Sequence, residues 1–194
     1  MNKTYVFQIG FNKCATRSLH HLFRKSGHKA LHYHYGRLAT AMDRRLKKGL
    51  APVPARWANV TFFSDMETIK GDKPIVEFAD SFKDLDRIYP NAIFVLNTRS
   101  QDRWIKSRLA HGGGAYLKAY MKKHGQTKEQ VITAWRRKWD KRHREVKRHF
   151  KGRPRKLLVY DIEKDRPEKI ARFFKGRIDV DPTHWKVLGK TRAK

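Results

Sequence analysis

Four side chains suited to holding an anion lie close together near the start of the chain. The stretch QIGFNKCATRSL contains Lys13, Thr16, Arg17 and Ser18 within six residues. Lysine offers a point charge, arginine offers a planar fork of N–H donors, and the two hydroxyls add further donors. This is more than the capping of a helix requires. The stretch therefore predicts a site for a phosphate or a sulfonate, and an ordinary strand-to-helix turn is the alternative.

The flanking residues place this stretch between a strand and a helix. Thr4 to Gly10 is β-branched and aromatic and ends at a glycine, which indicates a buried strand. Leu19, Leu22 and Phe23 keep helical spacing, which predicts a helix over Thr16 to Lys25. The N–H groups and the dipole at a helix start favour an anion. The Gly-Lys-Ser/Thr sequence of a nucleotide triphosphatase is missing, however, so the stretch is not the phosphate-binding loop of that class of enzyme.

A second pair of candidate residues follows the most apolar segment of the chain. In the stretch VLNTRSQDRWIKSR, Arg99 comes directly after a predicted strand and Ser107 lies eight residues further on. Eight residues are about two helical turns, so both side chains lie on one side of a helix. An Arg and a Ser aimed at one point suit a second phosphate. The alternative is a surface ion pair between Arg99 and Asp102.

Strands and helices alternate along the whole chain. The predicted strands are Thr4 to Gly10, Lys29 to Tyr35, Asn59 to Asp65, Ala92 to Thr98 and Lys156 to Ile162. The predicted helices are Thr16 to Lys25, Gly36 to Lys48, a segment capped by Asp72 with Pro74 in its first turn and ending near Ile88, Ser100 to His111, Lys128 to Lys151, and Pro167 to Lys175. This order predicts an α/β fold with a mainly parallel β-sheet and helices on both faces.

The composition limits the class of protein. With 194 residues we expect one domain over residues 1–194. The single cysteine, Cys14, excludes an intrachain disulfide, and it suits packing better than a nucleophilic role, although a helix start lowers thiol pKa values. We find no signal peptide and no apolar run of about 18 residues, so we expect a cytoplasmic protein without a transmembrane segment.

The excess of positive charge implies anionic partners. Lys and Arg number 46 against 18 acidic residues, for a net charge of +28. In the predicted helix Lys128 to Lys151, which has a capping box of Thr127 and Gln130, one side is apolar and the other is basic. The basic side consists of Arg136, Arg137, Lys138, Lys141, Arg142, Arg144, Lys147 and Arg148. Such a face indicates an acidic polymer or small molecule as partner, and a merely solvated surface is the alternative.

Together these motifs resemble the sulfotransferases that use 3′-phosphoadenosine 5′-phosphosulfate (PAPS). GFNKCATRSL is similar to the family's phosphosulfate loop, and VLNTRSQDRWIKSR to its 3′-phosphate segment with an Arg and a Ser eight apart. LLVYDIEKDRPEKIARFF resembles the late strand and helix of small bacterial members. The resemblance implies a P-loop nucleotide kinase-like fold, PAPS as donor, adenosine 3′,5′-bisphosphate as product, and no metal.

The same resemblance assigns roles to residues. It implies that the cofactor is held by Lys13, Cys14, Ala15, Thr16, Arg17, Ser18, Arg99 and Ser107. Ala15 replaces the usual glycine of the loop, so its backbone must avoid positive φ or tolerate strain. GKTRAK near the end of the chain is only a remnant of the family's Arg-Lys-Gly segment, and Lys190 and Arg192 are its candidate phosphate ligands.

For catalysis, the resemblance implies attack by an acceptor hydroxyl or amine on the sulfur. Lys13 is the residue we expect to stabilise the charge on the leaving oxygen. For the base that takes the acceptor's proton we rank His34 and His32 slightly ahead of Asp65 and Glu67. The sequence does not identify the acceptor. The net positive charge of the chain hints at an acidic glycan or small molecule.

Three other functions compete with this one. A nucleotide kinase should have an intact phosphate loop and metal carboxylates, and the loop does not fit. A nucleic-acid-binding module suits the charge but needs no pair of phosphate pockets, and we predict no specific nucleic-acid partner. An inactive sulfotransferase-like chain is the third, because Ala15 is atypical.

Overall fold

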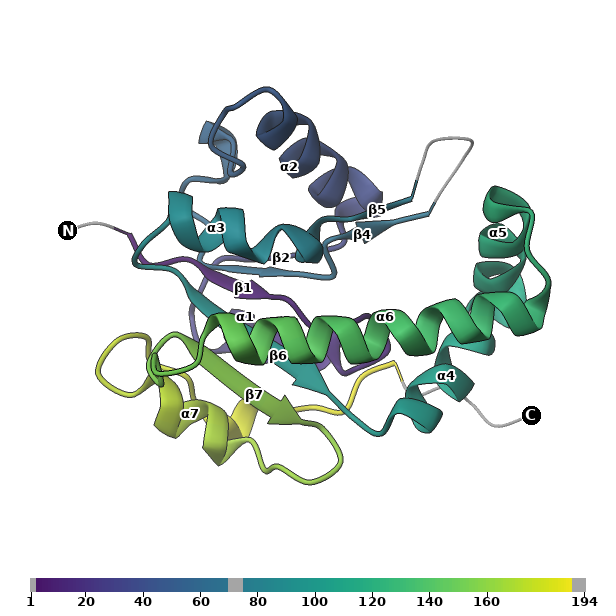
Figure 1. Cartoon of the computed structure of the whole chain (residues 1–194). Coiled ribbons are helices and arrows are strands. Elements are labelled where there is room, and N and C mark those ends of the chain that lie inside the picture. Colours follow the sequence, from purple (N-terminus) through teal and green to yellow (C-terminus); the bar gives the residue numbers. More distant parts are fainter. Residues whose placement is uncertain (1–2, 70–74, 190–194) are drawn as a thin grey trace.

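A parallel sheet of five strands forms the centre of the computed structural model, which describes residues 3–69 and 75–189 (Figure 1). The strand order is β2-β3-β1-β6-β7, and every pairing in this sheet is parallel. The strands are β1 (Val6–Gln8), β2 (Ala30–His32), β3 (Phe62–Ser64), β6 (Ile93–Thr98) and β7 (Leu157–Asp161). The parallel α/β sheet predicted from the alternation is thus confirmed.

Helices cover both faces of the sheet because successive strand residues point to opposite sides. Val6 packs with α1 (Thr16–Lys25) and α7 (Glu168–Phe174). Phe7, its neighbour, packs with α2 (Arg37–Lys47), α3 (Phe82–Ile88) and the end of α6 (Lys128–His149). In Figure 1, α2 and α3 lie above the sheet, α7 lies below it, and α6 runs across the front.

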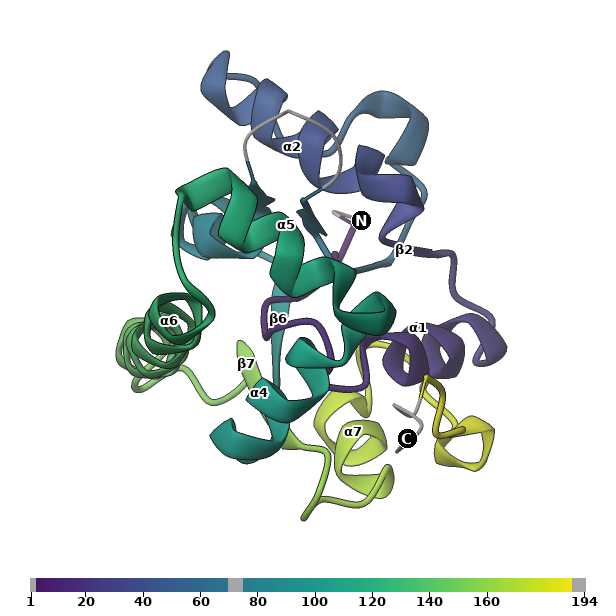
Figure 2. The same cartoon turned by 90° about the vertical axis from the view of Figure 1, so that its right-hand side faces the viewer.

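A third apolar cluster lies at the end of the sheet where the strands finish. It joins α4 (Gln101–Leu109), α5 (Ala115–His124) and α6 around the loop that follows β1. Phe11 of that loop packs against Trp104 and Trp139, with ring centroids 4.8 and 5.3 Å apart. Figure 2 looks onto this end, where α4, α5 and α1 gather. These helices therefore fix the shape of the loop from outside the sheet.

The chain order makes this end a natural binding place. From β1 the chain passes to β3 and β2 on one side and later to β6 and β7 on the other. In open α/β sheets ligands bind at the carboxyl ends of the strands where the direction of winding changes. The loop after β1 lies at that point.

One predicted helix was wrong at its start. The segment before Ile88 contains β5 (Val76–Glu77), which pairs antiparallel with β4 (Glu67–Thr68), then the short 3₁₀ helix η3 (Phe78–Ser81) and α3. The antiparallel pairing with the preceding strand β4 overrides the helical spacing that starts at Ile75. Asp72 and Pro74, predicted to begin the helix, lie outside the described residues.

Other boundaries differ by a few residues. The second strand ends at His32 because Tyr33, His34 and Tyr35 all have positive φ, and the 3₁₀ helix η1 (His34–Gly36) follows. The sequence analysis missed α5, which begins after the 3₁₀ helix η4 (His111–Gly114). The capping box of α6 is confirmed, with Thr127 and Gln130 bonding reciprocally. Two further 3₁₀ helices are η2 (Ala55–Trp57) and η5 (Pro182–His184).

Candidate active site

The loop after β1 is held from within by a buried asparagine that the sequence analysis did not single out. Asn97, on β6, donates from Nδ2 to the carbonyls of Phe11 (3.2 Å) and Cys14 (2.6 Å), and its Oδ1 accepts from Gln8. Gly10 passes so close to Asn97 that a Cβ at this position would overlap both its backbone and its side chain. Two loop carbonyls are thereby turned inward, which leaves the outer side of the loop for N–H groups.

The loop then enters α1 through an unusual backbone. Lys13 and Ala15 both have a φ of 60°, in the left-handed region. Ala15 is the N-cap and offers no side-chain cap, and the first hydrogen bond of the helix runs from the Leu19 N–H to the Ala15 carbonyl. The N–H groups of the first turn thus have no partner within the helix.

Lys13 is the cation at this helix start. Its side chain is partly buried, and burial lowers the pKa of its ammonium group, as do Arg17 and Arg99, while Asp65 acts to raise it. A lysine among cations is stabilised by an anion that binds beside it. Arg17 is exposed, close to Gly189 of the C-terminal segment.

The remaining loop residues are more enclosed than their sequence suggests. Thr16 is buried, and Ser18 is fully buried with its hydroxyl accepting the N–H of Leu188 at 3.0 Å. Ser18 therefore ties the C-terminal segment to α1 as well as lying in the loop. Cys14 is fully buried, and burial raises the pKa of its thiol, which favours packing over a nucleophilic role.

Arg99 reaches back to the loop from the start of α4. Its Nη1 donates to the Lys13 carbonyl at 3.3 Å, while Nε and Nη2 donate to Glu163 Oε1 at 3.1 and 2.9 Å. The expected alternative, a pair with Asp102, is not what forms, since Asp102 pairs with Arg136 at 2.6 Å. Glu163, 64 residues away in sequence, was not foreseen.

Ser107 lies on the side of α4 that faces the loop. Trp104, three residues earlier, donates from its indole N–H to the Asn12 carbonyl at 3.1 Å, and Arg108 is fully buried beside it. Ser107 itself is buried. Ser107 thus lies in the helix that packs on the loop, whereas Arg99 precedes its N-cap, Ser100, so the expectation that both side chains lie on one side of a helix was wrong for Arg99.

Asp65 and His32 form a pair at the ends of β3 and β2. Their side chains are 19% and 20% exposed, and His32 Nε2 lies 3.6 Å from Asp65 Oδ2. Burial raises the pKa of Asp65 to about 6, against the opposing pull of Arg108 and Lys13. Burial, His20 and Arg17 lower the pKa of His32 to about 4. Asp65 is therefore an ionised carboxylate near neutral pH, close enough to Lys13 for each charge to affect the other.

His34 and Glu67 are placed differently. His34 is exposed, and its ring meets the rings of Tyr35 and Trp57, the latter at 6.1 Å. Glu67 is buried in an ion pair with Arg108, 3.2 Å from its Nη2. Burial raises the pKa of Glu67 to about 8, although Arg108 pulls it down. Neither side chain offers what Asp65 does, a partly buried carboxylate close enough to Lys13 for their charges to interact.

Lys190 and Arg192, the last two predicted site residues, lie outside the described residues. A cavity of about 690 Å³ lies at the far end of α1, where Lys25, Ser26 and Gly27 form part of its wall. Because α1 has ten residues, this cavity is roughly 15 Å from the helix start. It is thus separate from the loop.

The comparison with known families agrees with this geometry. Residues 5–115, more than half of the chain, match the model of the sulfotransferase domain. The chain belongs to the sulfotransferase family. It is therefore an enzyme of the PAPS-dependent type, since this family typically uses PAPS. The matched region contains the loop, the ends of β2 and β3, and α4, and the resemblance drawn from the motifs is confirmed.

Two further searches give negative results. A search among curated proteins found no match. Among helices in residues 3–69 and 75–189, none is long and apolar enough to cross a membrane.

Proposed function

We propose that this sulfotransferase moves the sulfuryl group of PAPS to a hydroxyl or amine of an anionic acceptor, such as an acidic glycan, and releases adenosine 3′,5′-bisphosphate. The observation that carries the proposal is the start of α1 at the carboxyl end of β1. There, N–H groups without a partner inside the helix, Lys13 and Arg17 meet at the point where the winding of the sheet changes direction.

The residues fit a doubly phosphorylated nucleotide with a sulfonate. The loop from Lys13 to Ser18 supplies backbone N–H groups and cations for the phosphosulfate. Arg99, just before α4, and Ser107, in its last turn, are the proposed ligands of the 3′-phosphate. Lys190 and Arg192 stay proposed ligands on the ground of sequence alone. The cofactor supplies an activated sulfuryl group at the bridging oxygen.

Lys13 is the proposed stabiliser of charge on the leaving oxygen. A charge that develops in a transition state is best met by a preorganised donor in a poorly hydrated place. Partial burial and the neighbouring Arg17 and Arg99 give Lys13 that setting, because they disfavour an unpaired ammonium. Arg99 also holds the Lys13 carbonyl, so it fixes the backbone from which the lysine extends.

Asp65 is the base that we propose, ahead of His32, His34 and Glu67. A general base works best when its pKa lies near the operating pH, and the raised pKa of Asp65, about 6, meets this condition. His32 lies 3.6 Å away and orients the carboxylate from one side. Its own pKa, lowered to about 4, makes it a weaker proton acceptor.

The acceptor class is proposed from the surface of α6. Arg137, Lys141, Arg144 and Arg148 are all exposed, and their spacing places them on one stripe roughly 16 Å long. None of these four forms an ion pair within the described part of the chain. An acidic polymer that carries hydroxyl groups would both neutralise the stripe and offer an acceptor oxygen.

We further propose that residues 1–194 act as one domain. The family match ends at residue 115, yet β7 pairs with β6 over five residues of the same sheet, and Val146 and Phe150 lie in the same core as Phe7. The segment after residue 115 thus contributes a strand to the sheet and side chains to the core of the matched part, which supports one domain.

Calorimetry tests the donor. We expect adenosine 3′,5′-bisphosphate to bind more tightly than adenosine 5′-monophosphate, and ATP with Mg²⁺ to bind poorly. Sulfuryl transfer from PAPS is then measured with acidic glycans and with neutral glycans of similar size. Tighter binding of ATP with Mg²⁺ would point instead to a kinase, and faster transfer to neutral glycans would refute the acceptor class.

A further inference from the structure

Glu163 receives four donor groups at the start of α4. Its Oε1 accepts from Arg99 Nε (3.1 Å), Arg99 Nη2 (2.9 Å) and Arg103 Nη1 (3.4 Å), and its Oε2 accepts from the Ser100 N–H (3.0 Å). Only 18% of the side chain is exposed. A guanidinium fork together with the N–H of a helix start is a donor set that also suits a phosphate.

The position of Glu163 is built into the fold. It follows β7, whose neighbour in the sheet is β6, so the end of β7 lies beside the start of α4. The Glu163 N–H donates to Asp161 Oδ1 at 2.9 Å, which fixes the turn. Burial alone would raise the pKa of Glu163, but the Ser100 N–H and Arg99 outweigh it and lower the pKa. The group is thus a carboxylate in neutral solution.

Arg99 has few donors left once these bonds are counted. A guanidinium has five N–H groups, of which two go to Glu163 and one goes to the Lys13 carbonyl. The two shortest contacts of the Glu163 carboxylate are to Arg99 Nη2 and to the Ser100 N–H. A phosphate at the start of α4 would need these same donors. A phosphate oxygen bound there would also lie next to a carboxylate of like charge.

We propose that Glu163 is an internal competitor of the 3′-phosphate. Its carboxylate shares Arg99 with the cofactor's 3′-phosphate and lowers the affinity for every nucleotide that carries this group. The inference rests on the proposed function, because it assigns Arg99 to the 3′-phosphate.

The consequence falls on the product as well as on the donor. Adenosine 3′,5′-bisphosphate keeps the 3′-phosphate after transfer, and release of product limits the rate of many enzymes. When the 3′-phosphate leaves, the Glu163 carboxylate bonds again to the Arg99 guanidinium, and this makes release of the product faster. Glu163 is therefore a positioning residue that limits product affinity without touching the sulfur.

Calorimetry on the full chain tests this with Glu163→Gln. The amide keeps the size of the side chain and removes its charge. We expect the Kd of adenosine 3′,5′-bisphosphate to fall about tenfold, the effect of roughly one charge-assisted hydrogen bond. Binding of adenosine 5′-monophosphate should stay within about twofold, since it lacks the 3′-phosphate. Product inhibition in the transfer assay should strengthen by the same factor.

A matched control is Glu168→Gln, which changes the net charge equally. Glu168 is exposed in the first turn of α7, and it should leave both Kd values unchanged. Weaker or unchanged binding of adenosine 3′,5′-bisphosphate to Glu163→Gln would overturn the proposal and make Glu163 a fixed support of Arg99. An equal gain for both nucleotides would overturn it as a general charge effect. If the unaltered enzyme binds neither nucleotide, the proposed function itself fails and this inference with it.

Discussion

Two groups of charged side chains lie on either side of Asn12, and they use arginine in opposite ways. On one side, the loop before α1 and the first turn of this helix offer Lys13, Arg17 and N–H groups that have no partner inside the helix. On the other, Arg108 and Arg142 are buried among carboxylates and aromatic rings. In the second group, Arg108 Nη2 and Arg142 Nη2 bond to carboxylates, while Arg108 Nε and Nη1 and Arg142 Nε are buried without a hydrogen-bond partner among the described residues. The two groups thus differ in their carboxylate partners and in their burial: the buried arginines are paired with Glu67 and Glu77, whereas Arg17 is exposed.

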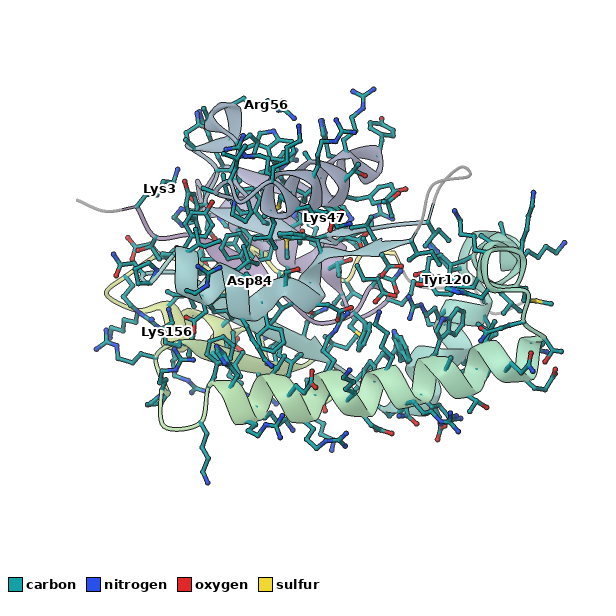
Figure 3. The ribbon with its side chains drawn as sticks, turned by 45° about the horizontal axis from the view of Figure 1, so that its top comes forward. Lys3, Lys47, Arg56, Asp84, Tyr120 and Lys156 are labelled. Atoms are coloured by element: carbon teal, nitrogen blue, oxygen red, sulfur yellow. The ribbon has the colours of Figure 1, made fainter. Side chains whose placement is uncertain are left out.

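The buried group is an extended ion-pair network. Arg108 Nη2 meets Glu67 at 3.2 Å and donates to Tyr120 at 3.0 Å, and Arg142 Nη2 meets Glu77 at 3.1 Å. Tyr120, labelled in Figure 3, lies on the side of α5 that faces the rest of the molecule. Burial would raise the pKa of Glu77, but Arg108, Arg142 and Lys138 lower it to about 2. The network therefore joins the β4–β5 hairpin to three helices.

The largest expected effect comes from opening this network with Arg108→Ala. Removing one partner of a buried ion pair costs about 3–5 kcal/mol of stability, because the other charges stay buried and unpaired. We expect that loss in the free energy of unfolding measured with urea. Lys106→Ala, on the exposed side of the same helix, should change it by less than about 0.5 kcal/mol. The nucleotide affinity of the folded fraction should change little. A large loss of affinity with normal stability would mean that Arg108 acts in nucleotide binding and not in holding the fold together.

Lys13→Ala tests the other group. We expect sulfuryl transfer to fall about 10²–10³-fold, the effect of deleting one preorganised donor at a developing charge. Stability should stay normal, because the side chain is only partly buried and belongs to none of the three apolar clusters of the described residues. Lys25→Ala, at the far end of α1, is the matched control and should keep full activity. Turnover within a few-fold of the unaltered enzyme would remove Lys13 from the mechanism.

Asp65 lies between the two groups, since both Lys13 and Arg108 act on its pKa. With a pKa of about 6, it holds a proton at lower pH and cannot accept another, so kcat/KM should fall as the pH drops through 6. Asp65→Asn should lower kcat/KM about 10²-fold or more and remove this limb. His32→Asn should keep it. A limb near pH 4 that vanishes in the His32 variant would make His32 the base.

The sequence predicted the loop before α1 far better than the buried ion-pair network of Arg108 and Arg142. The loop, α1 and Arg99 follow from local patterns of strand, turn and helix within a few residues. The network depends on contacts between β4, β5, α4 and α6, and Arg142 was wrongly placed on the basic side of its helix. Its burial against Glu77, 65 residues away, has no local signal. Glu163 escaped notice for the same reason.

Arg99→Ala tests whether Arg99 binds the 3′-phosphate, as we propose. A charge-assisted hydrogen bond contributes about 1.5–3 kcal/mol, so affinity for adenosine 3′,5′-bisphosphate should fall roughly 10- to 100-fold by calorimetry. Affinity for adenosine 5′-monophosphate should fall much less. Equal losses for both nucleotides would mean that Arg99 acts only through the Lys13 carbonyl, as a support of the loop.

The smallest effect is expected on α6, where the same contrast appears within one helix. Arg136, Lys138 and Arg142 pair with Asp102, Glu77 or Asp80, whereas Arg137, Lys141, Arg144 and Arg148 are exposed with no ion pair to a described residue. Figure 3 shows side chains of α6 that project away from the rest of the molecule.

Replacing these four exposed residues by Gln should raise the KM for an acidic glycan a few-fold and flatten its salt dependence. The attraction is long-ranged and is screened by salt over about 8–10 Å, so two ionic strengths separate it from direct contact. Nucleotide affinity should not change, because the stripe lies outside both phosphate segments. A control with Arg24, Lys25, Arg44 and Lys48 replaced removes equal charge from exposed sites on α1 and α2. If both quadruple variants raise KM alike, net charge alone attracts the acceptor; if neither does, the stripe is a solvated surface.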